Sequence, residues 1–191
     1  MGTGIIVCGL NGSGKSTLGK ALAETLQFHF IDVEDLYFPK TDPNYLYASP
    51  RNEDEVAKLF EEEIKAHENF VFAAVRGNYG INVRAAYQYV VLIQVPKEIR
   101  LKRVRERDFQ KFGNRVLPGG DLYEVTEAFF KKISARPDDY AEKWMESMDC
   151  PVIRVDGTKP IEENVVFIIK QMERKVGKQG GCICQKYRSK S

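Results

Sequence analysis

Short apolar runs alternate with longer amphipathic segments along most of the chain. The apolar runs cover residues 5–8, 28–32, 70–75, 89–95 and 152–155, lengths typical of buried strands. Apolar residues recur at helical spacing in 17–26, 53–67, 96–108, 122–148 and 161–176. We expect the fourth of these helices to break near Arg136-Pro137. Buried strands joined by helical crossovers predict an α/β fold, a five-stranded parallel sheet with helices on both faces.

The segments between these elements are expected to be turns and loops. Residues 36–51 suggest a short helix followed by a loop, and residues 82–87 a second short helix. Gly113, Pro118, Gly119 and Gly120 predict a mobile loop over residues 109–121. Gly177 is expected to end the last helix. We therefore predict a single domain over residues 1–177 and a polar tail over residues 178–191.

Several candidate functional residues lie at one end of the predicted sheet. Gly9, Asp32, Arg76 and Asp156 each lie at or just after the carboxyl end of a predicted strand. Ligands of open parallel sheets bind outside these ends. Residues far apart in sequence are thus expected to converge on one cleft.

Residues Gly9–Ser16 match the phosphate-binding pattern G-x-x-x-x-G-K-[ST] at every fixed position. The pattern lies between a predicted strand and a predicted helix, which argues against a chance glycine-rich turn. Backbone N–H groups and a helix N-terminus would surround an anion there. Lys15 is expected to neutralise the β- and γ-phosphates of ATP, and Ser16 to ligate Mg²⁺. The predicted nucleotide-binding residues of this segment are Gly9, Asn11, Gly12, Ser13, Gly14, Lys15, Ser16 and Thr17.

Composition excludes several classes of protein. The 191 residues are 43% apolar and carry a net charge of +2, too small an excess for a general nucleic-acid binder. No apolar run reaches membrane-spanning length, and the N-terminus leads straight into a strand, so we expect neither a membrane span nor a signal peptide. Cys8 and Cys150 are expected to be small buried hydrophobes in a reducing cytoplasm. Cys182 and Cys184 could bind a metal, but exposed thiols on a frayed tail are favoured, since no further Cys or His lies nearby.

Arginines gather in the helix predicted from Pro96. Arg100, Arg103 and Arg107 fall at i, i+3 and i+7, on one helix face. Guanidinium groups bind phosphate oxygens in bidentate geometry. Arg115 in the following loop could close over the phosphates, and Arg136 could act from the helix that leaves it. The alternative for this face is a solvated set of ion pairs with neighbouring acids.

The chain resembles the small P-loop kinases, such as adenylate kinase, shikimate kinase and gluconate kinase. Phe28–Asp35 resembles the second-strand region of shikimate kinase, where an Asp-x-Asp pair serves Mg²⁺ and the acceptor; Asp32 and Glu34 hold those places. Pro96–Arg107 resembles the helix that enters the kinase LID, and the loop at 109–121 then corresponds to a LID-like insert. Asp156–Pro160 resembles the loop that cups adenine, which assigns Asp156, Thr158 and Lys159 to the nucleotide.

The acceptor region departs from these relatives. Arg76-Gly77-Asn78-Tyr79-Gly80 matches neither the Asp-Gly-x-Pro-Arg signature of adenylate kinases nor the triple glycine of shikimate kinases. No guanine signature Asn-Lys-x-Asp and no Walker B acid of the ATPase type occurs, which leaves Asp32 as the best carboxylate for magnesium. Aromatic residues over 37–47 could stack on a substrate or pack under the loop. The predicted acceptor-binding residues are Glu34, Arg51, Arg76 and Gly77.

These features predict an ATP- and Mg²⁺-dependent phosphotransferase that acts on a nucleotide or another small metabolite. Lys15, Asp32, Arg103, Arg107 and Arg115 are the predicted catalytic residues, Ser16 and Asp32 the predicted metal ligands. The alternative is a P-loop ATPase whose turnover switches a partner protein. We expect a monomer or homodimer that binds neither nucleic acid nor membranes. His29 and His67 are not expected to be catalytic.

Overall fold

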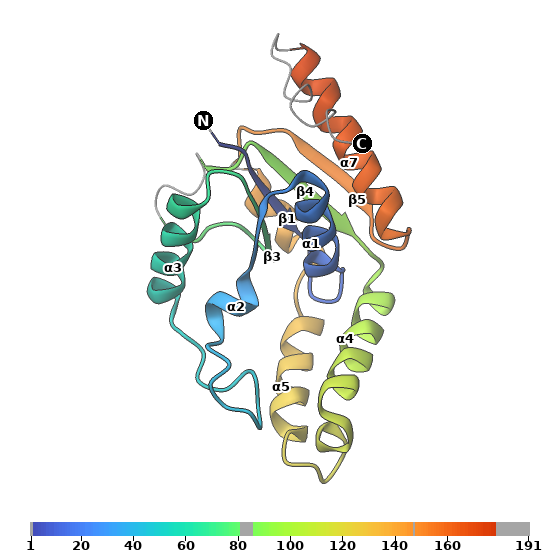
Figure 1. Ribbon diagram of the computed structural model, residues 1–191. Coiled ribbons are helices and arrows are strands. Elements are labelled where there is room, and N and C mark those ends of the chain that lie inside the picture. Colours follow the sequence, from blue (N-terminus) through green and yellow to red (C-terminus); the bar gives the residue numbers. More distant parts are fainter. Residues whose placement is uncertain (1, 81–85, 147, 179–191) are drawn as a thin grey trace.

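Five parallel strands form one sheet in the computed structural model, which describes residues 2–80, 86–146 and 148–178. The strands are β1 Gly4–Cys8, β2 His29–Asp32, β3 Phe70–Ala74, β4 Tyr89–Gln94 and β5 Val152–Asp156. Their order is β2-β3-β1-β4-β5, with β1 at the centre (Figure 1). Ile6 lies opposite Phe72 on one side and Val90 on the other. The predicted five-stranded parallel sheet is confirmed.

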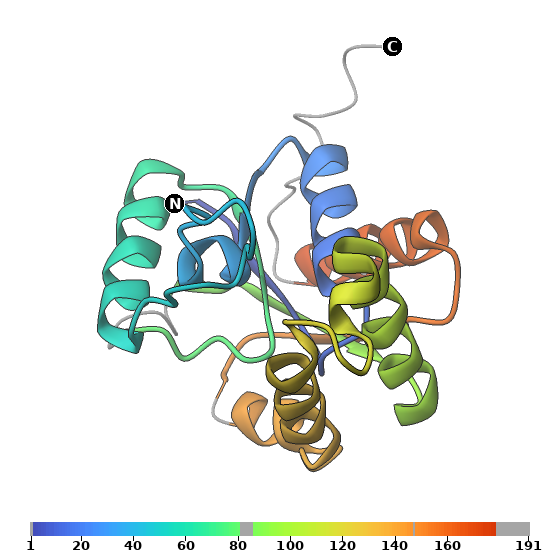
Figure 2. The same cartoon turned by 90° about the horizontal axis from the view of Figure 1, so that it is seen from below.

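Helices cover both faces of the sheet (Figure 2). They are α1 Lys15–Leu26, α2 Val33–Tyr37, α3 Glu53–Ala66, α4 Lys97–Phe112, α5 Tyr123–Ser134, α6 Tyr140–Met145 and α7 Ile161–Lys178, with the 3-10 turn η2 Gly113–Val116 after α4. Successive side chains of a strand point to opposite faces of the sheet, so each face packs against a different set of helices. Ile5 and Val7 of β1 pack in a cluster with α1 and α7, whereas Ile6 and Cys8 pack in a cluster with α2, α3 and α6. The result is the predicted three-layer arrangement.

Helix boundaries follow local capping chemistry where such chemistry exists. Asn52 caps α3, because its side chain accepts from the Glu55 backbone N–H while the Glu55 carboxylate accepts from the Asn52 N–H. The break expected near Pro137 is present, between α5 and α6. Cys8 is fully buried, as expected, and Cys150 is half-buried.

Three boundaries differ from the expectation. The helix α4 continues to Phe112 and η2 follows, so the first part of the expected 109–121 loop is helical. Phe112 contacts the rings of Tyr45 and Tyr47, a long-range contact, and Gly113 then ends the helix with φ near 59°. The helix α2 begins at Val33, because Asp32 caps it, and α7 runs through Gly177 to Lys178. The short helix expected over 82–87 falls largely outside the described residues, as does the tail with Cys182 and Cys184.

The helices α4 and α5 run side by side and project beyond the P-loop end of the sheet (Figure 1). Opposite them, the segment after α2 extends in the same direction. The site lies between these two projections. In the part of the chain that the structure describes, no helix is long and apolar enough to cross a membrane.

Candidate nucleotide and phosphoryl-transfer site

The loop between β1 and α1 has the backbone of a phosphate cradle. Gly9, Gly12 and Gly14 have φ of 150°, 80° and 92°, values that L side chains rarely adopt. A Cβ at Gly12 would lie 2.2 Å from the carbonyl oxygen of Arg100. No side chain caps α1 among the residues described, and no acid lies in its first turn. The helix N-terminus is therefore accessible to an anion, and the binding of phosphate there stays a prediction.

Lys15 is held above this loop. Its Nζ donates to the backbone oxygen of Leu10 at 3.2 Å. Burial lowers the pKa of Lys15 to about 8, while the carboxylates of Glu34 and Asp32 act in the opposite direction. An arriving phosphate would restore full charge to this amine.

The hydroxyls of the loop divide into two kinds. Ser13 is 1% exposed, and its Oγ has no hydrogen-bond partner among the residues described. Ser16 and Thr17 are exposed where α1 begins. Their hydroxyls are therefore accessible to a ligand.

A cavity of about 550 Å³ opens from the P-loop. Four segments form most of its lining: the P-loop with the start of α1, the β2–α2 junction, the carboxyl end of β3, and the inner side of α4. The lining includes Asn11, Gly12, Gly14, Lys15, Ser16, Thr17, Asp32, Val33, Glu34, Asp35, Lys40, Arg103, Arg107 and Lys111. The structure thus brings six of the eight predicted phosphate-binding residues together with both predicted acids and two predicted arginines. Gly9 and Ser13 do not line this cavity.

Asp32 occupies the junction between the strand β2 and the helix α2. Its Oδ1 accepts from the backbone N–H of Glu34 at 2.9 Å, which fixes the carboxylate at the cavity wall. Hydroxyl and carboxylate oxygens are the ligands that Mg²⁺ prefers. Ser16 and Asp32 line the same cavity and supply one of each. The donor set therefore fits the predicted magnesium site.

The three arginines of α4 have different surroundings. Arg107 lies at the cavity, 3.6 Å from Glu34 and 3.1 Å from Asp108. Arg103 also lines it, and both of its terminal nitrogens donate to the Gly157 carbonyl at 3.1 Å. Arg100 is only 5% exposed and bonds Val95, Asn11 and Asp138 instead. Arg100 shares the helical spacing of Arg103 and Arg107 but does not line the cavity; its side chain supports the P-loop backbone.

The loop assigned to adenine lies against the P-loop. Asp156 Oδ1 accepts from the backbone N–H of Thr158 at 2.9 Å and from its hydroxyl at 2.6 Å, which sets a tight turn. A Cβ at Gly157 would lie 3.0 Å from the Ser13 carbonyl oxygen. The contact of Arg103 with Gly157 joins this loop to α4. The role of Asp156, Thr158 and Lys159 in nucleotide binding stays a prediction.

Four other predicted residues are engaged elsewhere. Arg51 donates to the Leu36 carbonyl at 2.8 Å, and Arg76 lies 4.0 Å from Glu53 and 5.5 Å from the Tyr140 ring. Gly77 leaves no room for a side chain, since a Cβ there would lie 2.6 Å from Ile6 and Trp144. Arg115 bonds Asp121 and the backbone oxygen of Asn44. Their proposed roles toward a ligand stay predictions.

The sequence reading missed two basic residues. Lys40 and Lys111 line the cavity, with Lys40 paired to Asp35 and Lys111 bonded to the Tyr47 hydroxyl. Lys111 continues the spacing of Arg103 and Arg107 by one more turn, a signal that the helical period could have supplied. Lys40 follows a proline in an aperiodic segment and gives no such signal.

Arg136 donates to Asn11 Oδ1 at 2.6 Å and so reaches the P-loop from the α5–α6 junction.

Comparison with known structures supports the fold. A gluconokinase from Sinorhizobium meliloti 1021 is 17% identical and aligns over 93% of this chain and 97% of its own, with a TM-score of 0.54. A shikimate kinase from Acinetobacter baumannii, solved with shikimate, is 18% identical over 89% of this chain and 92% of its own, with a TM-score of 0.56. These similarities define a P-loop kinase-like fold.

Sequence comparison assigns the family. The uncharacterized protein YqaC of Bacillus subtilis (strain 168) is 30% identical over 169 residues, which cover 84% of this chain and 92% of YqaC. A shikimate kinase of Chlamydia pneumoniae is 42% identical over 59 residues, 31% of each chain. The family model AAA_18, an AAA domain, matches residues 5–115, more than half of the sequence. The chain therefore belongs to the AAA_18 family of P-loop domains.

Proposed function

We propose that this protein is an ATP- and Mg²⁺-dependent phosphotransferase that acts on a small-molecule acceptor. One observation carries the proposal: the P-loop, the acids of β2–α2 and the basic side of α4 line the same cavity of about 550 Å³. A pocket of this size suits a small acceptor beside the transferring phosphate. The kinase-like fold is consistent with it.

The chemistry follows from the residues at the cavity. The acceptor hydroxyl forms a bond to the γ-phosphorus while the bond to the bridging oxygen of ADP breaks. Asp32 takes the proton of that hydroxyl. Lys15 and Arg107 stabilise charge on the transferring oxygens, and Arg103 does so while holding the Gly157 loop. Ser16 would ligate Mg²⁺ and Asp32 would hold Mg²⁺-bound water; the ion would neutralise phosphate charge when it is bound.

A cytoplasmic location and a monomer or homodimer complete the proposal. Neither Cys8 nor Cys150 forms a disulfide among the residues described, which is in keeping with a reducing compartment. ATP and the acceptor are the expected partners.

The deciding experiment measures ADP release with Mg²⁺ and a panel of nucleosides, nucleotides and sugar acids. We expect one acceptor class to raise ADP release well above the acceptor-free rate, and phosphorylated acceptor to form in equal amount. Lys15→Ala should remove this activity while the circular dichroism spectrum stays that of the native protein, because Lys15 bonds the loop rather than the core. ADP release that no acceptor changes would contradict the kinase and support the ATPase alternative. Undiminished turnover by Lys15→Ala would contradict both.

A further inference from the structure

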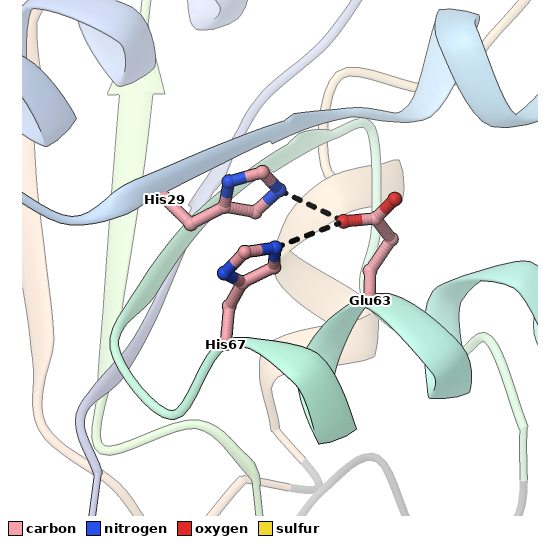
Figure 3. A group of neighbouring side chains, drawn as sticks. All are labelled: His29, Glu63 and His67. Carbon is pink, nitrogen blue, oxygen red and sulfur yellow. Dashed lines mark hydrogen bonds and ion pairs between the residues drawn. The ribbon is translucent and has the colours of Figure 1, made fainter.

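Both histidines of the chain lie together, at the end of the sheet opposite the P-loop. His29 is the first residue of β2, and His67 follows the last turn of α3. Their rings stack with centroids 3.6 Å apart and planes 14° from parallel, and Glu63 faces both (Figure 3). Asp32, at the other end of β2, lies three residues and thus about 10 Å further along the strand. This group is therefore separate from the nucleotide cavity.

The donor atoms of the three side chains converge. Glu63 Oε2 lies 2.8 Å from His29 Nε2 and 4.0 Å from His67 Nε2. One ligand atom from each residue lies within 4.8 Å of the other two. Tetrahedral Zn²⁺ with bonds of about 2.0–2.1 Å holds its ligand atoms about 3.3 Å apart. Because the two rings stack with their planes 14° from parallel, one imidazole has to rotate about its side-chain bonds before both Nε2 atoms can point to one ion.

The backbone already fixes the three positions. The backbone N–H of His67 donates to the Glu63 carbonyl at 3.0 Å, and the backbone N–H of His29 donates to the Asn69 carbonyl at 3.0 Å. The strand start, the helix end and the connection to β3 are thereby tied together. Only side-chain freedom remains to be lost on binding an ion, and this lowers the entropic cost.

Charge and ligand type favour a divalent transition metal. The helix α3 carries six acidic and two basic residues, and its C-terminal, negative end points to the group. Two imidazoles and one carboxylate form a ligand set typical of zinc, whereas Mg²⁺ prefers oxygen ligands. All three side chains are between 35% and 43% exposed, so an ion can reach them from solvent.

We propose that His29, Glu63 and His67 form a binding site for Zn²⁺, with solvent completing the coordination. The ion would join the edge strand β2 to α3 and stabilise this side of the sheet. This proposal does not depend on the proposed phosphotransferase activity.

The test is a zinc titration followed by calorimetry and by NMR of the imidazole signals. The background is the full chain with Cys182→Ser and Cys184→Ser, because the Cys-x-Cys tail could bind zinc by itself. We expect one Zn²⁺ per chain, a raised melting temperature and shifts of both histidine signals, which report on this group alone because the chain has two histidines. Excess Mg²⁺ should not displace the ion.

Matched variants separate the site from general charge effects. His67→Ala and Glu63→Gln should each weaken zinc affinity at least about tenfold, as loss of one ligand predicts. Glu62→Gln removes the same charge from the neighbouring, exposed position of α3 and should leave the affinity unchanged. Absence of zinc binding in the background protein would overturn the proposal. Unchanged affinity in His67→Ala, or an equal loss in Glu62→Gln, would overturn it as well.

Discussion

Lys15 is poised to change its charge near neutral pH. Burial lowers its pKa to about 8, so the free amine is protonated below that pH and neutral above it. Only the protonated form pairs with phosphate, so ATP binding should raise this pKa and draw a proton from solution. We expect the Kd for ATP to rise about tenfold between about pH 7 and about pH 9. Titration of the terminal phosphate of ATP does not contribute to this change in Kd, since its pKa is about 6.

Calorimetry at about pH 8 in two buffers with different ionisation enthalpies measures the proton uptake directly. Lys15→Arg is the matched control, because a guanidinium keeps its charge throughout this range. Its Kd should be flat with pH, whatever its absolute value. A flat Kd for the unchanged protein would show that ATP binding is not linked to a change in the protonation of Lys15.

Asp32 can be tested without loss of structure. It caps α2 by accepting from the Glu34 N–H, and asparagine is an equally good cap, so Asp32→Asn should keep the melting temperature. If the carboxylate takes the acceptor proton, kcat should fall by about 10²-fold or more. ATP affinity without Mg²⁺ should hardly change. Asp54→Asn, an exposed carboxylate on α3, serves as the control and should keep full rate. Full kcat in Asp32→Asn would leave Asp32 with only its capping role.

The helix α4 carries arginines on two sides, and we expect a catalytic role for one side and a structural role for the other. Arg107 faces the cavity, whereas Arg105 pairs with Glu127 and lies 3.7 Å from the Phe130 ring on the α5 side. We expect Arg107→Ala to lower kcat about 10³-fold, as for arginines that stabilise a transferring phosphate. Arg105→Ala should cost about 1 kcal/mol of stability and leave kcat unchanged.

Steady-state kinetics and thermal unfolding of both variants check this contrast. A normal kcat in Arg107→Ala, with a small loss of stability, would show that its pairing with Glu34 and Asp108 is its whole role. The mechanism proposed above would then lack its main positive charge from α4.

The elements differ in how far sequence alone could predict them. The strands and the P-loop follow from local patterns, because apolar runs and fixed glycine spacing leave few alternatives. The end of α4 could not be predicted, since Phe112 stays helical through contacts with Tyr45 and Tyr47 far away in sequence. The surroundings of Arg100 could not be predicted for the same reason, because it bonds Asp138 and the P-loop backbone, both far away in sequence. Lys40 reaches the site only through tertiary structure.

At the scale of the whole molecule, two projections enclose the cavity. One is the α4–α5 pair, and the other is the aromatic loop, residues 38–49 (Figure 1). The two projections touch at their ends. The ring centroid of Phe112 lies 5.6 Å from that of Tyr45 and 5.9 Å from that of Tyr47. Arg115 also donates to the backbone oxygen of Asn44. Closure of this kind would exclude water from the transferring phosphate.

Phe112 should therefore hold the aromatic loop against α4. Each ring pair contributes about 0.5–1.5 kcal/mol, so Phe112→Ala should raise the opening equilibrium of the loop about tenfold or more. Hydrogen exchange measures this directly, as faster exchange of backbone amides over residues 38–49. Phe109→Ala is the matched control, because Phe109 lies on the same helix, is 47% exposed and borders a separate cavity with Leu117 and Phe130. An ATP analogue with Mg²⁺ should slow exchange over residues 38–49 and 109–121 in the unchanged protein and in Phe109→Ala, and less in Phe112→Ala. Equal exchange in both variants would mean that the loop keeps its position without this contact, and that closure depends on the ligand alone.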